Sequence, residues 1–430
     1  MSSNGKPKKI LVIGGGISGI TASVEASEAG CDVVLVERQP YLGGRVVRMH
    51  QYFPKLCPPA CGLEISLRRL RTSPRIQCLT LAQVEQITGG PGHYQATIRQ
   101  QPRRVSGKCT ACGACVAACP VERRDEFNAG MGATKAIYLP HAMAHPLQFM
   151  IDADVCPGAA CGKCVPACPY QAIDLEMKPR TITVEVQAVV WATGWEPYDA
   201  GKLTDLGFGT YPDVLTNVMM ERLASPVGPT AGRIQRPSDG QPVESVAFVQ
   251  CAGSRDENYL KHCSAVCCAA SLKQARYVRA QYPDAHIYVF YIDIRTPGRL
   301  EDFYAESQKD DKLHLIKGKV AKITEETPGG ALVVEAEDVL SGRRVSQKVS
   351  LVVLATGIVP SGWAGQLNGH DGRATLARDE HGFLTSAQPA AGLLAAGCAK
   401  RPMEVAACVR DATGAALKAL QICVGQASGQ

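Results

Sequence analysis

The stretch ILVIGGGISGITASVEASEAGCDVVLVER, residues 10–38, decides the fold. Its apolar runs predict a β-strand, a glycine-rich turn, a helix and a second strand. Gly14 permits the tight turn, Gly16 lets the backbone approach a pyrophosphate, and Gly19 permits close packing of helix on strand. Glu37 ends the second strand, at the spacing needed to accept a hydrogen bond from a ribose 2′-hydroxyl. The stretch therefore predicts a dinucleotide-binding βαβ unit.

Four further motifs follow in chain order: LGGR (42–45), WATG (191–194), LATG (354–357) and GLLAAGCAKRPMEVAACVRDATGAALKAL (392–420). The ordered set resembles the thioredoxin-reductase-like flavoproteins with two dinucleotide-binding domains, and the resemblance implies an α/β fold with non-covalently bound FAD. In many such proteins an Asp follows the glycine of the last motif. Here Cys398 takes that place, so we expect backbone N–H groups and the following helix terminus to supply the contact. The expected FAD-binding residues are Gly14, Gly16, Gly19, Glu37, Arg38, Gly43, Gly44, Arg45, Val84, Thr193, Gly194, Gly397 and Cys398.

The composition points to bound metal. The chain has 430 residues, enough for two or three domains, and 19 cysteines. Disulfide-dense proteins of this kind are small and secreted, whereas this chain is long, and the apolar run that follows the N-terminal lysines is too short for a signal peptide. Metal ligation in a reducing cytosol is the better explanation. No apolar run approaches the ~18 residues of a membrane span, and the formal charge of +6 is mild, without the basic aromatic blocks of nucleic-acid binders.

Two cysteine runs predict an inserted ferredoxin module. CTACGACVAACP has the bacterial ferredoxin spacing CxxCxxCxxxCP. In the second run, CPGAACGKCVPACP, four residues instead of two separate the first two cysteines. In such pairs the fourth cysteine of each run ligates the other run's [4Fe–4S] cluster. The expected ligand sets are Cys109, Cys112, Cys115 and Cys168 for one cluster and Cys156, Cys161, Cys164 and Cys119 for the other. Zinc is the rival ligand, but two CxxxCP endings favour clusters.

A third set of cysteines lies in CAGSRDENYLKHCSAVCC, at the position where a flavin disulfide reductase would bind NAD(P)H. Residues 246–250 and 286–292 predict strands and residues 264–281 a helix, so the cysteines replace the Gly-rich phosphate turn. Arg255, Lys261 and His262 can offset the charge of a thiolate-ligated cluster. We expect a third [4Fe–4S] cluster on Cys251, Cys263, Cys267 and Cys268.

The remaining cysteines and two histidines are less specific. Cys57 and Cys61, in YFPKLCPPACGLE, fit a redox pair, ligands completed by a partner, or structural thiols in a Pro-braced loop. His141 and His145 flank a Pro-containing loop and suggest surface positions. Four cysteines in apolar contexts predict packing roles: Cys31, Cys78, Cys408 and Cys423.

The whole chain resembles the A subunit of heterodisulfide reductase, which shares the FAD fold, the ferredoxin insertion, the Cys-x11-Cys-x3-Cys-Cys pattern and the GCAK motif. QYFPKLCPPACGLE (51–64), YLPHAMAHP (138–146) and WATGWEPYDA (191–200) are more similar to the A subunits of the quinone-interacting membrane-bound oxidoreductases (Qmo) of dissimilatory sulfur metabolism. The narrower resemblance implies Qmo B and C subunits and adenylylsulfate reductase as partners. It also implies a cytoplasmic position at the inner face of the membrane, with quinone reached through the C subunit.

The motifs suggest three functions. The first is an oxidoreductase subunit that passes electrons between adenylylsulfate (APS) reductase and a quinone-reducing membrane partner, by itself not NAD(P)H-dependent. Within it, a subunit that only conducts electrons, with no small-molecule substrate, is also possible. The second is a subunit of a soluble heterodisulfide-reductase-type complex that can split electron pairs at one flavin. The third, an ordinary NAD(P)H-dependent flavoenzyme, is disfavoured by the cysteines in the second dinucleotide-binding position.

The predicted domain boundaries follow from the order of the motifs. The ferredoxin module interrupts the FAD-binding domain, and the third cysteine set lies in a degenerate NAD-binding-like domain. We predict FAD-binding segments at 1–104, 179–240 (with a linker) and 351–430, the ferredoxin-like module at 105–178, and the degenerate domain at 241–350.

Overall fold

The computed structural model describes residues 8–362, 376–385 and 391–425. Its first layer is a parallel five-stranded sheet in the order β22-β11-β1-β2-β3. The strands span Lys9–Ile13 (β1), Asp32–Val36 (β2), Ile76–Leu79 (β3), Ala188–Trp191 (β11) and Leu393–Ala395 (β22). Apolar runs such as KILVI form the buried centre of this sheet, as parallel strands covered on both faces require.

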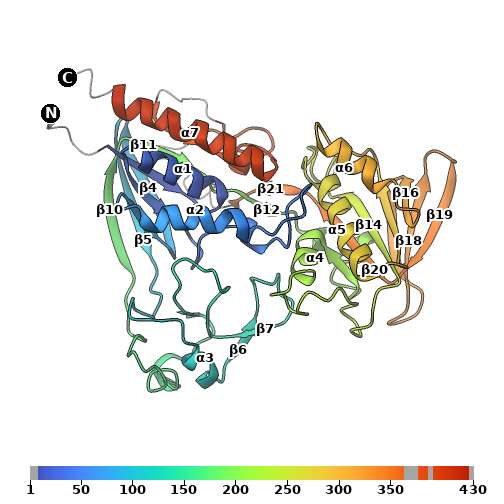
Figure 1. The fold of residues 1–430 in the computed structure, drawn as a ribbon, viewed down its shortest axis with the longest axis horizontal. Helices are drawn as coiled ribbons and strands as arrows, with labels where there is room; N and C mark the ends of the chain where they lie inside the picture. Colours follow the sequence, from blue (N-terminus) through green and yellow to red (C-terminus); the bar gives the residue numbers. More distant parts are fainter. Residues whose placement is uncertain (1–7, 363–375, 386–390, 426–430) are drawn as a thin grey trace.

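Helices cover one face of this sheet and a second sheet covers the other (Figure 1). The helices are α1 (Ile17–Glu28), α2 (Ala60–Thr72) and α7 (Val405–Gly425). Small apolar residues such as Ala412 and Ala416 let α7 pack closely against α1 and the sheet. The opposite face packs on the antiparallel sheet β10-β5-β4, whose strands span Ala82–Gly90 (β4), His93–Gln100 (β5) and Arg180–Val186 (β10).

The cysteine-rich insertion connects β5 to β10, which are antiparallel neighbours with Arg99 opposite Thr181. It enters and leaves the FAD-type domain at the same edge. Its elements are α3 (Ala114–Ala118), β6 (Glu122–Arg124), β7 (Ala133–Lys135), β8 (Ile137–Tyr138), β9 (Met150–Ile151) and η2 (Gly158–Ala160). Val105, Phe149 and Ile151 form a small core in which cysteines take the place of larger apolar residues.

The second dinucleotide-type domain has a parallel sheet in the order β13-β20-β14-β15-β16 and an antiparallel sheet β17-β18-β19. Its elements are β13 (Val214–Thr216), α4 (Asn217–Leu223), β14 (Ser245–Ala252), α5 (Cys267–Gln281), β15 (His286–Tyr291), α6 (Leu300–Ser307), β16 (Leu313–Lys317), β17 (Val320–Glu325), β18 (Leu332–Asp338), β19 (Arg343–Val349) and β20 (Leu351–Thr356). Two antiparallel segments, β12 (Trp195–Pro197) and β21 (Ile358–Pro360), connect it to the first domain.

Two sequence expectations need correction. The boundaries expected at 240/241 and 350/351 both fall within the second domain, because β20 pairs with β13 and β14 rather than with the FAD-type sheet. The helix expected from residue 264 begins at Cys267, because Ala265 has a positive φ of 60° and residues 264–266 form a tight turn. The predicted α/β class with two dinucleotide-binding-type domains is confirmed. Among the described residues, no helix combines the length and apolarity needed to cross a bilayer.

Candidate functional site

The glycine-rich turn between β1 and α1 leaves one side open. A Cβ on Gly14 would lie 2.3 Å from the Ala192 carbonyl oxygen, and a Cβ on Gly19 would lie 1.7 Å from the Gly14 carbonyl oxygen. Close packing against β11 therefore requires both glycines. By contrast, a Cβ on Gly16 would meet only the Cα of Gly44, at 3.9 Å. The open space faces the unpaired N–H groups at the start of α1, so these residues fit a bound pyrophosphate.

Glu37 lies at the end of β2, beside this turn. Its buried carboxylate accepts hydrogen bonds from the N–H groups of Gly15 (2.6 Å) and Gln39 (2.7 Å). Burial raises the pKa of the carboxyl, and the two backbone donors oppose that shift. Each oxygen keeps a further lone pair for a ribose hydroxyl. The neighbouring Arg38 instead forms a half-exposed ion pair with Glu196 on β12, at 2.5 Å.

The turn 43–45 packs directly on the glycine-rich turn, with a hydrogen bond from the Gly43 N–H to the Gly15 carbonyl at 2.8 Å. Arg45 extends from it toward β12. Its Nε donates to the Trp195 carbonyl at 3.2 Å, and its guanidinium lies 5.2 Å from the centre of the Trp195 ring. Burial lowers the pKa of Arg45 to about 10. The two turns therefore border the same opening.

The other expected FAD-binding positions surround this opening. Thr193 and Gly194 follow β11, and the Thr193 Cα would lie 3.1 Å from a Cβ on Gly14. Gly194 has a φ of 71°, which favours glycine. Val84 is buried in β4, a strand whose first residue donates to the Glu37 carbonyl at 2.9 Å. The structure thus gathers these sequence motifs around one site.

The last motif differs from the expectation in detail. The Gly397 N–H donates to the Asp411 carboxylate of α7 at 2.8 Å, and Lys400 pairs with the same carboxylate at 2.6 Å. This N–H is therefore not free, in this conformation, for the cofactor contact that we expected of it. The Cys398 sulfur points toward α7, 3.5 Å from the Cys408 sulfur. Asp411 was missed from the sequence because it lies fourteen residues after the glycine that it binds.

Two cavities in the insertion are each lined by four cysteines. The set of one is Cys109, Cys112, Cys115 and Cys168, and that of the other is Cys119, Cys156, Cys161 and Cys164. The fourth cysteine of each run lines the cavity of the other run, which is the exchange typical of two-cluster ferredoxins. The 3-10 turn Gly158–Ala160 accommodates the extra residues after Cys156.

The residue types in the cavities bear on the choice between zinc and larger clusters. Each of the three linings contains four cysteines and no histidine. Both runs of the insertion also end in CxxxCP, the ending of bacterial ferredoxin runs. The residues present therefore fit [4Fe–4S] clusters, and in the insertion they favour clusters over zinc.

The third cavity is lined by Cys251, Cys263, Cys267 and Cys268. Cys251 lies near the end of β14 with a φ of 56°, and Cys267 and Cys268 begin α5. The Cys267 sulfur lies 3.7 Å from the Thr356 carbonyl, so the LATG motif borders this cavity rather than the FAD-type opening. Burial raises the pKa of Cys251 to about 11. Metal binding would therefore displace a proton from this thiol.

Two glycines near the third cavity are closely packed. A Cβ on Gly253, after β14, would lie 2.7 Å from the Tyr198 ring, and one on Gly357, after β20, would lie 2.3 Å from the Ser254 hydroxyl. The expectation that the second domain does not bind NAD(P)H stays a prediction.

A buried ion pair of the second domain lies at its contact with the first domain, and no sequence motif had predicted it. Lys273 of α5 is fully buried and lies 2.9 Å from the Glu221 carboxylate of α4 and 2.7 Å from the Gln51 carbonyl. Glu221 also accepts from the His50 N–H (3.0 Å) and the Gln274 amide (2.7 Å). Residues 50 and 51 follow the FAD-type turn, so the pair fixes the second domain against the opening of the first.

The insertion also contacts both domains. Arg103 donates to the Pro40 carbonyl at 2.5 Å, beside the FAD-type turn. Asn128 of the insertion accepts from Arg222 of α4 at 2.8 Å, and Arg222 donates to the Arg48 carbonyl at 3.1 Å. The insertion, the FAD-type turn and the second domain therefore meet at one junction.

A surface role was expected for His141 and His145 in preference to ligation; both side chains are half-buried, and neither lines one of the three cysteine cavities. The His141 ring stacks on Phe127 at 5.1 Å and packs edge-on against Tyr41 at 5.2 Å. The His145 carbonyl accepts from the Leu42 N–H at 3.0 Å. Burial lowers the pKa of both imidazoles to about 4. They belong to the packing between the insertion and the first domain.

The remaining cysteines divide into two groups. Cys57 is half-buried and Cys61 exposed; both are free thiols near Tyr52, whose pKa burial raises to about 12. The structure leaves their three alternative roles open. The other group agrees with the predicted packing role, because its members are buried or half-buried: Cys31, Cys78, Cys408 and Cys423.

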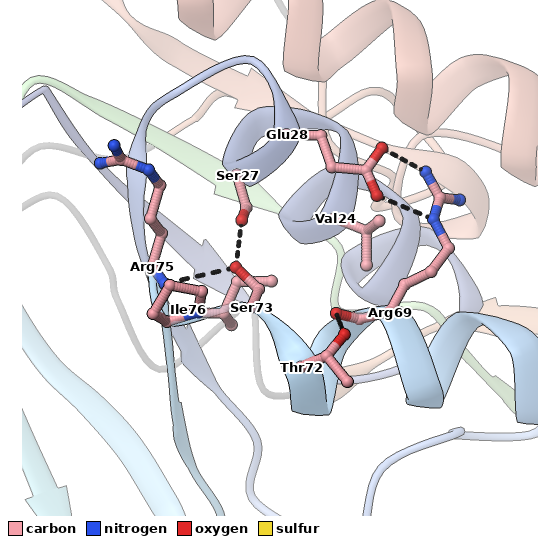
Figure 2. A pocket seen from close by; sticks show the side chains of 9 residues that line it. Val24, Ser27, Glu28, Arg69, Thr72, Ser73, Arg75 and Ile76 are labelled. Atoms are coloured by element: carbon pink, nitrogen blue, oxygen red, sulfur yellow. Dashed lines mark hydrogen bonds and ion pairs between the residues drawn. The ribbon is translucent and has the colours of Figure 1, made fainter.

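A surface hollow between the C-terminal ends of α1 and α2 lies away from these sites (Figure 2). Arg69 forms two hydrogen bonds with Glu28 across it, at 2.6 and 2.9 Å. The hydroxyls of Ser27 and Ser73 lie 2.5 Å apart on its wall. The glycine-rich turn is at the opposite end of α1, so this hollow is a structural contact between the helices rather than the cofactor site.

Two families match parts of the chain. The family described as FAD dependent oxidoreductase matches residues 9–57, and the 4Fe-4S binding domain matches residues 103–122. These matches cover the glycine-rich turn and the first ferredoxin run. The chain therefore carries an FAD-binding and a 4Fe–4S-binding sequence.

Similar proteins extend the comparison to nearly the whole chain. It is 38% identical, over 98% of its length, to the A subunit of the ferredoxin:CoB-CoM heterodisulfide reductase of Methanosarcina mazei, of which it covers 54%. It is 35% identical, over 96%, to the A subunit of the H2:CoB-CoM heterodisulfide,ferredoxin reductase of Methanothermobacter marburgensis, of which it covers 63%. The chain thus spans between half and two thirds of the length of these relatives.

Solved structures agree on the fold. Thioredoxin reductase of Lactococcus lactis superposes with a TM-score of 0.53 at 13% identity, covering 97% of this chain and 99% of that one. Thioredoxin reductase of T. acidophilum gives 0.52 at 12% identity, with coverages of 98% and 100%. The predicted thioredoxin-reductase-like fold is confirmed, and identities this low support nothing beyond the fold.

Proposed function

Since the chain belongs to the heterodisulfide reductase A-like family of FAD- and [4Fe–4S]-containing oxidoreductases, we propose that it is the electron-distributing subunit of a heterodisulfide-reductase-type complex. In this role it holds one FAD and three [4Fe–4S] clusters. The observation that carries the proposal is that one chain combines three four-cysteine cavities with one open dinucleotide site.

Different residues would bind the flavin and the clusters. The N–H groups at the start of α1 and the Glu37 carboxylate bind the dinucleotide, and Arg45 fixes the turn beside it. When bound, FAD exchanges electrons in pairs or singly, whereas each cluster accepts one. The twelve cysteines of the three cavities would hold the clusters through their thiolates. We expect no direct reduction by NAD(P)H, because cysteines replace the Gly-rich phosphate turn after β14.

Electrons therefore have to enter and leave through other proteins. The A subunits that resemble this chain are named as parts of ferredoxin- and H2-dependent heterodisulfide reductases. By analogy we propose partner subunits that dock at the insertion and at the second domain. Whether electron pairs are split at the flavin depends on those partners.

A second candidate rests on three sequence segments. Residues 51–64, 138–146 and 191–200 are more similar to the A subunits of Qmo complexes than to other relatives of this family. We propose as an alternative that the chain, at the cytoplasmic face of the membrane, passes electrons between adenylylsulfate reductase and a quinone-reducing membrane subunit. Two of these segments line the junction described above, through the Gln51 carbonyl and the His141 ring.

Affinity capture of the chain from native membranes and from the native soluble fraction separates the two candidates. Recovery with adenylylsulfate reductase and a membrane cytochrome-type subunit supports the Qmo-like function. Recovery in a soluble complex with hydrogenase or formate dehydrogenase supports the heterodisulfide-reductase-type function. Purified chain with FAD but no iron would contradict both.

A further inference from the structure

The three cysteine-lined cavities differ in charge. The linings of the two insertion cavities contain no charged side chain. The third lining contains Arg255, Asp293 and Arg295 beside its cysteines, and so carries one net positive charge. The sequence had indicated Arg255, Lys261 and His262 for this role. Of these three residues only Arg255 lines the cavity, and Arg295, from the loop after β15, lines it as well.

Asp293 holds both guanidiniums. It pairs with Arg255, and it accepts from Arg295 Nε at 3.3 and 3.2 Å and from Arg295 Nη2 at 3.2 Å. Both arginines line the same cavity as the four cysteines. The carboxylate therefore fixes two cations beside the proposed cluster.

Resting on the third cluster of the proposed function, we propose that Arg255 and Arg295, positioned by Asp293, give this cluster the highest reduction potential of the three. Reduction adds one electron to an anionic thiolate-ligated cluster. Nearby positive charge stabilises the reduced form more than the oxidised form, and hydrogen bonds to the sulfurs act in the same direction. The N-terminus of α5, which starts at Cys267, adds its positive dipole end.

Burial acts in the opposite direction. Cys251, Cys267 and Cys268 are buried, whereas Cys112 of the insertion is exposed, and water stabilises a more negative cluster. The guanidiniums outweigh this effect because both line the cluster cavity itself. Arg255, whose side chain is 21% exposed, is screened less by water than Arg295, which is 47% exposed. An electron that enters at the insertion would then move downhill to the second domain, where a partner removes it. This order of potentials assigns a direction to electron transfer through the chain.

The test is a potentiometric titration of the anaerobic FAD- and iron-loaded protein, followed by electron paramagnetic resonance. In the unmodified chain, the first cluster to be reduced should be the one whose signal is missing from a variant with Cys267→Ser and Cys268→Ser. Arg255→Gln and Arg295→Gln should each lower the reduction equilibrium constant of that cluster about tenfold, or about 59 mV for one electron. The insertion signals should keep their potentials. Lys261→Gln, an exposed cation two residues from Cys263, is the matched control and should change nothing.

Several outcomes would overturn the proposal. One is that the third cluster is reduced last; another is that its potential is unchanged in both arginine variants at full iron content. Should the Gln variants lose the cluster, Arg255→Lys and Arg295→Lys decide the matter, because they keep the charge. An unchanged potential in these supports the proposal, and a tenfold decrease contradicts it. If the double cysteine variant loses no iron, the third cluster itself is absent, and the proposed function fails instead.

Discussion

The buried pair of Glu221 and Lys273 gives the sharpest test of how the two domains are joined. Glu221→Gln keeps the shape but removes the negative charge, and Lys273 is fully buried, so an uncompensated ammonium remains. Breaking a buried pair in this way costs about 3–5 kcal/mol. Lys273→Met should cost less, about 1–3 kcal/mol, because Glu221 keeps donors from His50 and Gln274. The double variant should lower the free energy of unfolding by less than the sum of the two single effects.

The assay is thermal unfolding of anaerobic, cofactor-loaded protein followed by circular dichroism. With about 2–4 °C per kcal/mol for domains of this size, Glu221→Gln should lower the apparent Tm by roughly 6–20 °C. Lys312→Met is the matched control, because its pair with Asp284 is equally close, at 2.6 Å, but solvent-exposed. That control should change stability by less than about 1 kcal/mol. The argument is refuted if Glu221→Gln behaves like the control, or if the two single effects simply add.

Three further predictions concern the cofactors and pH. Gly16→Val should lower FAD occupancy at least about tenfold in folded protein, since its Cβ meets only Gly44 at 3.9 Å; normal flavin absorbance would contradict this. Excess NADH or NADPH should leave the flavin oxidised for minutes under anaerobic conditions, and rapid bleaching would revive an NAD(P)H-dependent function. The pKa of His141 is lowered to about 4, so the stability that the neutral ring contributes should be complete above about pH 6.5 and lost as the pH falls toward 4. His141→Phe should flatten that part of the unfolding profile, and an unchanged profile would remove His141 as its cause.

The sequence predicted the motifs that depend on short spacing. Gly19 has to be glycine because a Cβ would collide with the Gly14 carbonyl five residues earlier, and Gly14 because its φ is 106°, so their pattern is visible in the chain. The ferredoxin runs are visible for the same reason, since three sulfurs of each cavity come from one short turn. The exchange of Cys119 and Cys168 between the cavities followed from the known pairing of such runs.

Contacts between residues on different elements could not be predicted from the sequence motifs. Asp411 binds the Gly397 N–H from another element, and Arg295 reaches the third cavity from a loop that the cysteine pattern does not include. The LATG segment was assigned to the FAD-type domain because strand ends of both domains share that sequence. Only the pairing of β20 with β14 places it beside Cys267.

Quantification of iron, acid-labile sulfide and flavin in anaerobically prepared protein tests the central claim most directly. Three cubane sites and one dinucleotide site predict about twelve irons, about twelve sulfides and one FAD per chain. Four of the irons should be lost in the variant with Cys267→Ser and Cys268→Ser, with FAD retained. Zinc in place of iron, or no loss of iron in that variant, would contradict the claim that the three cysteine-lined cavities hold [4Fe–4S] clusters.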